Sequence, residues 1–462
     1  MRKFYYCFSF VLILTLSFSS GYKNQSLESV NNQGRGKISD DSLLTLVQYR
    51  TFQYFWEGAE PNSGMARERF HVDGIYPDDD MNVVTSGGTG FGLMAILVGI
   101  ERGFITREEG YSRFCRIVEF LKKSDRFHGA WSHWIYGETG RVKPFGTKDN
   151  GADIVETAYL MQGLLTVRQY FKNGSEKEKV LASDIDMLWR EIEWNWFTKG
   201  AENVLYWHWS PDYGWEMNFQ VRGYNECLIL YILAASSPTF PIQVKAYHEG
   251  WARDGAINTL SGKYGYVLKL KHNGAEEYGG PLFWAHYSYL GLDPRNLRDK
   301  YADYWQENKN QTLINWKWCS LNRKNYAGYS KVCWGLTAGY SLKFYAAHSP
   351  GEENDLGVIT PTAALSSFPY TPDHSMDALK YFYYKLGNKI WGEYGFYDGF
   401  SEQFNWFPQK YLALDQGPEV VMIENYRTGL LWNLFMSCGE ISEGLFRLGF
   451  TVSANDQNYN HE

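Results

Sequence analysis

The sequence predicts an all-α fold, a single domain in which six helical hairpins close into an (α/α)6 toroid. One observation behind this prediction is the spacing of apolar residues, which recur every three or four positions along most of the chain beyond residue 40. Another is that no segment alternates strand and helix, and no proline- or serine-rich linker divides that part of the chain. A solenoid of stacked helix pairs is the alternative, but no strict sequence period favours it.

Individual helices are expected wherever this spacing continues for about 10–20 residues. The first helix should begin at Ser39 or Asp40, and Thr106 and Glu109 form a capping box ahead of another. The remaining helices are expected near 87–102, 152–172, 178–197, 224–236, 242–257, 297–308, 331–347, 375–387, 418–437 and 439–448. Residues 263–273 are the best candidate for a strand or a small β-hairpin.

The start of the chain resembles a secretory signal peptide, which we place at residues 1–20. Arg2 and Lys3 precede the apolar stretch 7–18, which is short for a membrane span, and small residues follow it. We therefore expect a protein that is secreted across the inner membrane into the periplasm, with no membrane span. A disordered leader is expected at 21–38, the catalytic domain at 39–452 and a tail at 453–462.

Charge and cysteine content exclude several kinds of partner. The formal net charge is −7 and no basic footprint is visible, so we expect no nucleic acid as a partner. We expect the cysteines of the mature chain to be small buried side chains, with a Cys319–Cys333 bridge as the exception. The 10 histidines are scattered and no CxxC or HExxH pattern occurs, so no metal site is predicted.

Aromatic residues gather in polar, loop-like stretches. The sequence has 18 Trp, 35 Tyr and 28 Phe, and many lie in 129–140, 205–219 and 402–411 among Ser, His, Asp, Asn and Gly. Flat rings beside polar groups suit a sugar, whose faces are C–H surfaces and whose rim is hydroxyls. Half-buried residues that fill loops are the alternative for any single Trp. As sugar platforms we expect Trp131, Trp134, Trp207, Trp209 and Trp215.

Three acids crowd the expected start of one helix. Asp149, Asp153 and Glu156 are spaced i, i+4 and i+7, which places them on one helical face. Like charges on one face repel unless a helix dipole or a ligand compensates them. The alternative is a cap formed by Asp149 together with pairing of the other acids with the helix dipole.

A fourth acid opens an uncharged run. Glu226 precedes residues 227–235, which carry no charge, so burial should raise its pKa as a general acid at neutral pH requires. Pairing of Glu226 with Arg222 is the structural alternative.

A fifth acid lies near the end of the chain. Pro418 is expected in the first turn of a helix capped by Gly417, which leaves Asp415 in the preceding loop. An ionised Asp415 that projects into a cleft would suit a general base. Glu424 and Arg427, spaced i, i+3, are expected to form a structural pair.

Two further signals are weaker. The glycine-rich segment 86–92 lacks the GxGxxG spacing of a nucleotide site and is expected to be a helix-entry loop with close backbone packing. Arg67 is a candidate contact for a sugar hydroxyl, with a surface role as the alternative.

Several long segments together resemble the glycoamylase-like family of bacteria, which includes the β-1,2-glucanases of glycoside hydrolase family 144. The resemblance covers about residues 40–450 and is carried by KDNGADIVETA (148–158), VRGYNECL (221–228), GPLFWAHYSYLGLDP (280–294), PTAALSSFPYTP (361–372), IWGEYGFYDGFSE (390–402) and LDQGPEVVMIENYRTGLLW (414–432). It implies an (α/α)6 barrel and an inverting hydrolase that needs no cofactor and acts on linear β-1,2-glucan. The expected products are sophorose or short sophoro-oligosaccharides.

The resemblance also implies roles for individual residues. Glu226 matches the acid position and Asp415 the base, while Asp149 and Asp153 match pocket acids near the cleaved bond. The proton route can run through a substrate hydroxyl or a water chain. The alternatives are a hydrolase or phosphorylase of another glycan on the same barrel, and an inactive glycan-binding protein. We expect a monomer.

Overall fold

The computed structural model describes residues 36–452. The expected signal peptide, most of the expected leader and the expected tail lie outside the described residues. The chain divides into two units, Met1–Ser39 and Asp40–Glu462. In the first unit, residues 36–39 are exposed and belong to no helix or strand. The description that follows concerns the second unit. Among its described residues no helix is both long enough and apolar enough to cross a membrane.

The described chain is mostly helical, with 46% of residues in helices and 14% in strands. The α-helices are α1 (Asp40–Trp56), α2 (Ser86–Glu101), α3 (Arg107–Lys123), α4 (Ile154–Phe171), α5 (Glu176–Arg190), α6 (Leu228–Ser236), α7 (Tyr304–Leu321), α8 (Pro361–Leu365), α9 (Pro372–Tyr381), α10 (Gly387–Ile390), α11 (Ala413–Arg427), α12 (Leu430–Met436) and α13 (Gly439–Arg447). Short 3₁₀ or π turns connect several of them, including η3 (Ala246–Trp251), η5 (Leu282–Ala285), η6 (Tyr287–Tyr289) and η7 (Phe382–Leu386).

The strands form small antiparallel sheets in the loops rather than one large sheet. Within residues 36–452 there are seven sheets of two or three strands. The pairs are β1 (Arg69–His71) with β14 (Lys410–Leu412), β5 (Ala152–Asp153) with β6 (His208–Trp209), β7 (Asn258–Lys263) with β8 (Tyr266–Leu270), β9 (Leu297–Arg298) with β15 (Thr451–Val452), β10 (Ala338–Tyr340) with β11 (Tyr345–Ala347) and β12 (Trp391–Gly392) with β13 (Gly395–Phe396). The three-stranded sheet joins β2 (Val83–Thr85), β3 (Trp134–Tyr136) and β4 (Val142–Lys143).

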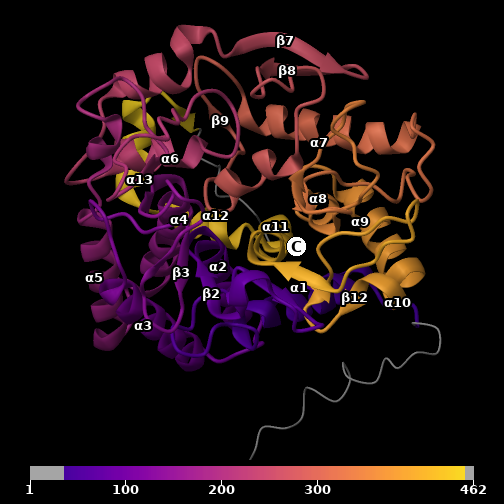
Figure 1. The fold of residues 1–462 in the computed structure, drawn as a ribbon, viewed down its shortest axis with the longest axis horizontal. Helices are drawn as coiled ribbons and strands as arrows, with labels where there is room; N and C mark the ends of the chain where they lie inside the picture. Colours follow the sequence, from indigo (N-terminus) through magenta and orange to yellow (C-terminus); the bar gives the residue numbers. More distant parts are fainter. Residues whose placement is uncertain (1–35, 453–462) are drawn as a thin grey trace, which may run out of the picture. The chain divides into compact units, whose positions relative to one another are not determined.

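Deeply buried helices alternate along the chain with helices that bury one face. Helices α2, α4, α6 and α8 are buried along almost their whole length, and most of α11 is buried too. By contrast, α3, α5 and α9 bury only one apolar stripe. The buried helices contact one another: α2 packs against α4 and α11, α4 against α6, and α8 against α11. Figure 1 shows α11 nearly end-on, with α2 and α12 beside it.

Glycines let these buried helices approach closely. A side chain added at Gly90 in α2 would lie 2.1 Å from the backbone oxygen of Tyr159 in α4, and one at Gly163 would lie 2.2 Å from the oxygen of Gly90. The expected close backbone packing of 86–92 is therefore confirmed. The expectation of a loop was wrong, because these residues form the first turns of α2.

The main predicted helices are present, and so is the capping box. Thr106 accepts from the backbone of Glu109, whose side chain accepts from Thr106 in return, at the start of α3. The strand candidate at 263–273 corresponds to the β7–β8 hairpin. Sequence did not predict the short helix α8 or the 3₁₀ turns at η5 and η6. Cys319 and Cys333 are free thiols, so the bridge considered between them is not formed.

Three predicted helices were wrong in kind or position. Residues 331–347 form a loop and the β10–β11 hairpin instead of a helix, and Gly335 adopts a left-handed φ of 128° that a helix does not allow. The helix expected at 297–308 begins only at Tyr304, after β9. At 242–257 only the π turn η3 and a 3₁₀ turn form. Glycines and turn residues interrupt the apolar spacing in these segments.

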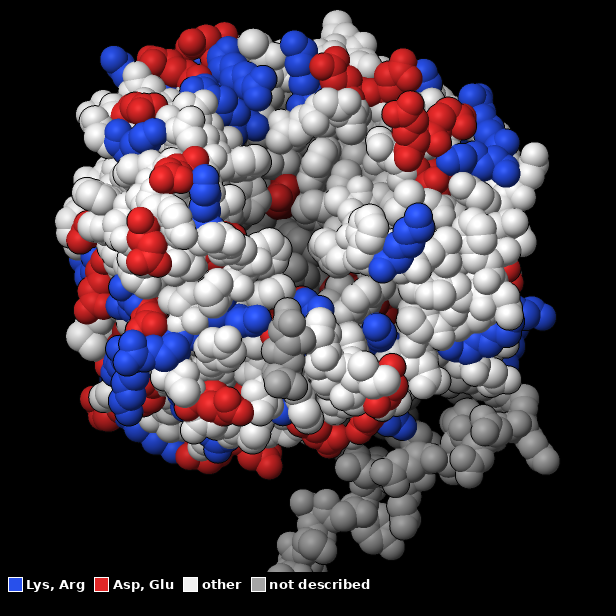
Figure 2. Space-filling view, in the orientation of Figure 1, with Lys and Arg blue, Asp and Glu red and all other residues white. Residues whose placement is uncertain are grey.

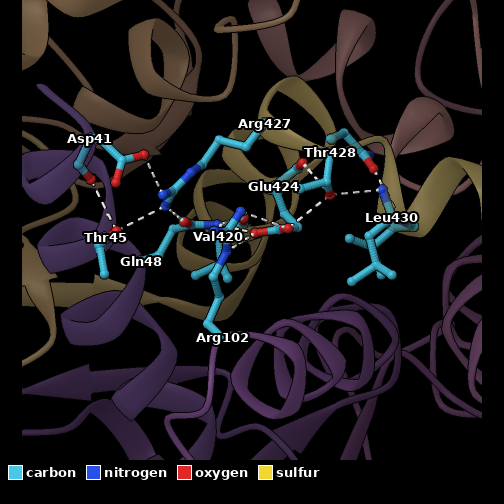
Figure 3. Close-up of polar contacts among 11 residues, drawn as sticks. Asp41, Thr45, Gln48, Arg102, Val420, Glu424, Arg427, Thr428 and Leu430 are labelled. Atoms are coloured by element: carbon cyan, nitrogen blue, oxygen red, sulfur yellow. Dashed lines mark hydrogen bonds and ion pairs between the residues drawn. The ribbon is translucent and has the colours of Figure 1, made fainter. Parts of the chain in front are cut away.

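A buried ion-pair network fastens α11 to α1 and to the end of α2. The Glu424 carboxylate, 2% exposed, accepts from both Arg102 Nε (2.7 Å) and Arg102 Nη2 (2.9 Å), and from Gln48 (2.9 Å). Arg427 instead donates to Asp41 (2.6 Å), as Figure 3 shows. The expected Glu424–Arg427 pair was therefore wrong, because Arg102 reaches Glu424 from α2 while Arg427 turns toward α1.

Replacing Arg102 with alanine should destabilise the protein by about 2–3 kcal/mol, because it leaves the Glu424 carboxylate buried without its bidentate cation. The free energy of unfolding in denaturant measures this loss. Arg141→Ala is the control, since the side chain of Arg141 is 77% exposed and lies 3.9 Å from Asp125. That substitution should change the stability by less than about 0.5 kcal/mol. Equal losses in the two variants would contradict a structural role for the Arg102–Glu424 pair.

Candidate active site

The acids singled out by sequence lie at the N-terminal ends of three buried helices. Asp153 is the N-cap of α4, where its side chain accepts from the backbone N–H of Val155 (3.0 Å) and Glu156 (2.9 Å). Glu226 immediately precedes Cys227, the N-cap of α6. Asp415 lies in the first turn of α11. Helix N-termini stabilise negative charge, so the local folding of these segments favours anionic groups here. Figure 2 shows a hollow in the face of the molecule that is turned toward the viewer, with atoms of acidic residues inside it.

Around the start of α4, two histidines lie among the crowded acids. His133 Nδ1 lies 3.3 Å from Asp153 Oδ2, and His133 Nε2 lies 3.9 Å from Glu156 Oε1. His208 Nε2 lies 3.5 Å from Asp149 Oδ2. The like-charge cluster predicted from sequence is present. Asp149 belongs to the loop before β5 and does not cap α4, so the three acids converge without sharing a helical face.

Burial and mutual repulsion set the protonation of this cluster. Burial would lower the pKa of His133, but the charges of Glu156, Asp153 and Asp149 outweigh it and raise that pKa to about 9. Burial, with repulsion from Asp153, raises the pKa of Asp149 to about 7. Burial likewise raises the pKa of Glu156 to about 7. Burial acts against ionisation of Asp153 as well, yet its hydrogen bond with His133 and the charge of His208 keep its pKa lowered.

The same cluster has the ligand types of a metal site. One ligand atom from each of His133, Asp149 and Asp153 lies within 4.8 Å of the others. The neighbouring carboxylates raise the pKa of His133 and so favour the imidazolium, which supplies positive charge beside them. A metal ion at this position would have to displace that proton, because a metal binds a neutral imidazole.

Glu226 has the environment expected of a general acid. Its side chain is partly buried, and burial together with repulsion from Glu156 raises its pKa to about 7. Arg222 does not pair with it, because that guanidinium donates to Gln220 and to the backbone oxygens of residues 249 and 250. The alternative of an Arg222–Glu226 pair was therefore wrong. A carboxyl that holds its proton near neutral pH can donate it to a leaving group.

Asp415 is buried inside the first turn of α11 rather than displaced in a loop, with 2% of its surface exposed. Helix α11 starts at Ala413, so Pro418 lies within it and Gly417 is not its cap. Gly417 is required for another reason, since a side chain there would lie 2.4 Å from Phe91 Cβ of α2. Burial and the neighbouring Asp398 carboxyl raise the pKa of Asp415 well above its usual range.

Packed rings link Glu226 to Asp415. Tyr287, in η6, is 5% exposed and packs against Tyr159, which donates to the backbone oxygen of Glu226 (3.3 Å). Tyr287 also packs against Phe91, which lies beside Gly417, two residues after Asp415 in α11. Tyr345, in β11, lies near the charges of Asp415 and Asp398, and its ring is 48% exposed and so accessible to a ligand. The elements α6, α11, η6 and β11 thus meet at one site.

Two of the expected sugar contacts are structural instead. Trp131 is fully buried, and its indole donates to the backbone oxygen of Leu121 (3.2 Å), so it cannot present a ring face to a ligand. Arg67 is 9% exposed and donates to the backbone oxygens of Gly58, Ala59 and Met81 and to Asn82. These two expectations were wrong because both side chains are engaged in holding loops.

The other four tryptophans are partly buried. Trp207 donates from Nε1 to Asp153 Oδ2 (3.0 Å), which places it at the acid cluster. Trp134 packs edge-on against Phe145 beside His133. Trp209 lies edge-on to His128, and Trp215 packs against Trp196. Trp207 and Trp134 therefore lie next to the acids, while Trp209 and Trp215 belong to a neighbouring aromatic cluster.

Comparison with known proteins identifies the family of this chain. Residues 218–439 match the family model Glycoamylase, described as "Putative glucoamylase". The endo-β-1,2-glucanase from Chitinophaga pinensis, solved with sophorotriose and glucose, is 65% identical with a TM-score of 0.89, and the match covers 90% of this chain and 99% of that one. The chain belongs to the glycoamylase-like family.

Two more relatives show the breadth of this likeness. The exo-β-1,2-glucooligosaccharide sophorohydrolase (non-reducing end) of Parabacteroides distasonis is 47% identical over 426 residues, or 89% of this chain. This chain spans only 58% of the length of that relative. An endo-β-1,2-glucanase from Talaromyces funiculosus, solved with sophorose, shares the fold at 11% identity with a TM-score of 0.63, and the match covers 88% of this chain and 92% of that one.

Sequence reasoning missed several residues of this glycoamylase-like site. His133 stands in one of the aromatic stretches but was not recognised as the cation of the acid cluster. Asp398 and Tyr345 stand alone in loop segments and become notable only when the chain brings them beside Asp415. An isolated charged residue within an aromatic, glycine-rich segment such as 390–402 is the one local signal that could have indicated Asp398.

In this glycoamylase-like protein, Trp207→Phe should lower kcat/KM about tenfold. The substitution removes the hydrogen bond that the Trp207 indole donates to Asp153, a charged and fully buried carboxylate. The measurement is hydrolysis of sophoro-oligosaccharides. Trp316→Phe is the control, since Trp316 is also partly buried but its Nε1 donates to the backbone oxygen of Lys331 (3.0 Å) and not to an acid of the site. Equal kcat/KM values for the two variants would contradict a role for the Trp207–Asp153 contact.

Proposed function

We propose that this chain is a glycoside hydrolase that cleaves linear β-1,2-glucan to sophorose or short sophoro-oligosaccharides with inversion. The carrying observation is that Glu226 and Asp415, at the starts of α6 and α11, are joined through the packed rings around Tyr287. One of these rings, Tyr159, donates to the backbone oxygen of Glu226 (3.3 Å), and another, Phe91, lies beside Gly417 of α11. Paired carboxyl groups on the two sides of a glycosidic bond are what such hydrolysis requires. The activities of the Chitinophaga and Parabacteroides relatives support the β-1,2 linkage.

Glu226 acts as the general acid. It must be protonated to donate to the departing glycosidic oxygen, and its pKa of about 7 keeps a large protonated fraction near neutral pH. Above that pH the acid loses its proton, so kcat/KM should fall as the pH rises through about 7.

Asp415 acts on the side of the attacking water and takes up its proton, directly or through a substrate hydroxyl or a water chain. The backbone that carries this carboxyl is fixed in the first turn of α11, where the backbone oxygen of Asp415 accepts from Thr362 Oγ1 (2.7 Å). A fixed backbone limits the reorganisation that the base needs in the transition state.

Asp149 and Asp153 bind hydroxyls of the sugar next to the cleaved bond. Asp153 is held rigidly by backbone N–H groups, His133 and Trp207. Ionised carboxylates accept hydrogen bonds from hydroxyls, and the adjacent imidazolium limits their mutual repulsion. The rings of Trp134 and Trp207, and more remotely Trp209 and Trp215, serve as sugar platforms.

The arrangement of helices supports the finer fold proposal of an (α/α)6 toroid. The buried elements contact one another in series: α2 with α4, α4 with α6, α6 with η6, α8 with α11, and α11 with α2. The remaining link joins η5 and its C-cap His286 to the segment after α8, through Tyr370 Oη to the backbone oxygen of Ala285 (2.9 Å) and His286 Nε2 to Ser367 Oγ (3.0 Å). Six buried elements in a closed series are what a ring of six hairpins requires.

Secretion into the periplasm and a monomeric state remain part of the proposal. The secretion proposal rests on the basic, apolar and small-residue order of positions 2–21.

Product analysis tests the proposal directly. The purified protein is incubated with linear β-1,2-glucan and, in parallel, with laminarin, cellulose oligomers and starch. Sophorose-series products from the β-1,2-glucan alone are expected. Products from another glycan alone would show that the enzyme is a hydrolase of that glycan instead. Product release that depends on phosphate would indicate a phosphorylase. Binding without release from any glycan would leave the inactive binding protein.

A further inference from the structure

Two buried carboxyls of the site each have one oxygen without a hydrogen-bond donor. Asp398 and Asp415 are each 2% exposed, and the Oδ1 atom of each has no hydrogen-bond partner within the described part of the chain. Buried carboxylate oxygens are nearly always hydrogen-bonded, because an unsatisfied buried acceptor is costly. The proposed reaction gives Asp398 no role.

The two carboxyls lie close together, since each acts on the pKa of the other and the backbone of Asp398 is bonded to β14, which leads directly into α11. Ionised carboxylates only accept, so a hydrogen bond between the two groups needs a proton on one of them. The remaining contacts place Asp398 firmly: its Oδ2 accepts from the backbone N–H of Tyr340 (2.5 Å), and its own N–H donates to the backbone oxygen of Lys410 (2.9 Å). Gly339 leaves space for the Asp398 carboxyl, since a side chain at position 339 would lie 3.0 Å from Asp398 Oδ2.

The charged and titratable groups around the pair do not provide a dedicated cation. Glu419 of α11 is a further acid, and burial raises its pKa to about 8. Glu68 and Arg69 pair with each other beside Tyr340, and Lys410 Nζ lies over the ring of that tyrosine. Tyr345 and His348 complete the surroundings; burial lowers the pKa of His348 to about 4, so it is neutral. A shared proton is therefore the main compensation for two adjacent carboxyls.

We propose that Asp398 is a positioning residue for Asp415 and that the two carboxyls bind protons as a pair. The proposal rests on the hydrolytic function assigned above. Before reaction the pair holds one proton and one negative charge. The attacking water gives its proton to the ionised carboxyl, so the pair becomes neutral as Glu226 protonates the leaving oxygen. Afterwards the pair releases one proton to solvent and Glu226 takes one up, which restores the starting state.

The first test is the pH profile of Asp398→Asn on sophoro-oligosaccharides. The amide can still donate to Asp415, but it cannot lose a proton, so the ionisation that takes the pair from one bound proton to none disappears. We expect kcat to fall at least about tenfold with little change in KM, and the alkaline limb of the kcat profile to move to higher pH because Glu226 alone then sets it. An alkaline limb that stays at the wild-type position would overturn the proposal.

Asp355→Asn is the matched control for this profile. Asp355 is 3% exposed but accepts from Trp318 (2.8 Å), Tyr329 (2.8 Å) and the backbone N–H of Gly357 (3.0 Å), so it shares no proton with another carboxyl. The Asp355→Asn substitution should leave the alkaline limb of the kcat profile at the wild-type pH. A limb shift of the same size in Asp355→Asn would also overturn the proposal, because burial of any carboxyl would then account for it.

A second readout needs no catalysis. A carboxyl pair with raised pKa values binds a proton in the folded state that the unfolded chain has already released, so its contribution to stability falls as the pH rises. As the pH rises above the ordinary range of carboxyl pKa values, wild type should therefore lose stability relative to Asp398→Asn. Parallel stability profiles would overturn the shared proton even if the enzyme proves active. The stability of wild type could fall relative to that of Asp398→Asn as the pH rises while the protein does not act on β-1,2-glucan. That result would support the carboxyl pair and reject only the hydrolytic function.

Discussion

Glu226→Gln should abolish the release of sophoro-oligosaccharides while the protein stays folded. Glutamine fills the same space but has no proton to give to the leaving oxygen. Loss of a general acid lowers kcat about 10²–10⁴-fold. The backbone oxygen of Glu226 accepts from the hydroxyls of Tyr159 and Ser288, and these hydrogen bonds survive the substitution. Turnover of linear β-1,2-glucan and far-UV circular dichroism measure the two parts of this expectation.

The matched control is Glu193→Gln. Glu193 is also partly buried, but it pairs with His128 (2.9 Å) in a groove that none of the site acids lines. Its replacement should leave turnover unchanged. Undiminished activity of Glu226→Gln would remove this residue as the acid, and an equal loss in Glu193→Gln would point to a general effect of charge removal.

Asp415→Asn should be nearly as damaging, with a loss of about 10²-fold or more in kcat. Asparagine cannot accept the proton of the attacking water. It can still donate to Asp398 and keep the backbone contact with Thr362, so the fold and the binding of sophorotriose should persist. Steady-state kinetics and calorimetric titration with sophorotriose separate the loss of chemistry from a loss of binding.

Glu419→Gln controls for a change in the same helix. Glu419 lies one turn further along α11 and accepts from Thr51 (3.0 Å), and burial raises its pKa to about 8. Because it is largely protonated near neutral pH, glutamine replaces it with almost no change in charge, and activity should stay close to wild type. Full activity of Asp415→Asn would refute the base assignment.

Prediction from sequence succeeded where residue type alone carries the information. An acid before a long uncharged run, as at Glu226, indicates a raised pKa whatever the exact start of the helix. The crowding of Asp149, Asp153 and Glu156 was likewise visible, although their convergence depends on a loop and not on a helical face. The mostly helical character of the chain followed from apolar spacing.

Prediction failed where a long-range neighbour decides the outcome. Gly417 was interpreted as a cap, but the reason for a glycine there is Phe91 of α2, which no local pattern reveals. Arg102 takes Glu424 away from its expected partner for the same reason. Asp398 is recognisable as a residue of the site only from its neighbour Asp415. The polar residues around Trp131 suggested a sugar platform in a loop, but the ring of Trp131 is buried.

The Glu424 network joins the first helix of the described domain to one of its last. Gln48 and Glu424 are 376 positions apart in the sequence. A chain made from its N-terminus therefore cannot complete the contacts of α1 until α11 has been synthesised, and contacts of such long separation slow folding. The nascent protein must remain incompletely folded for most of its synthesis. That delay would suit a polypeptide that is exported through a channel before it folds.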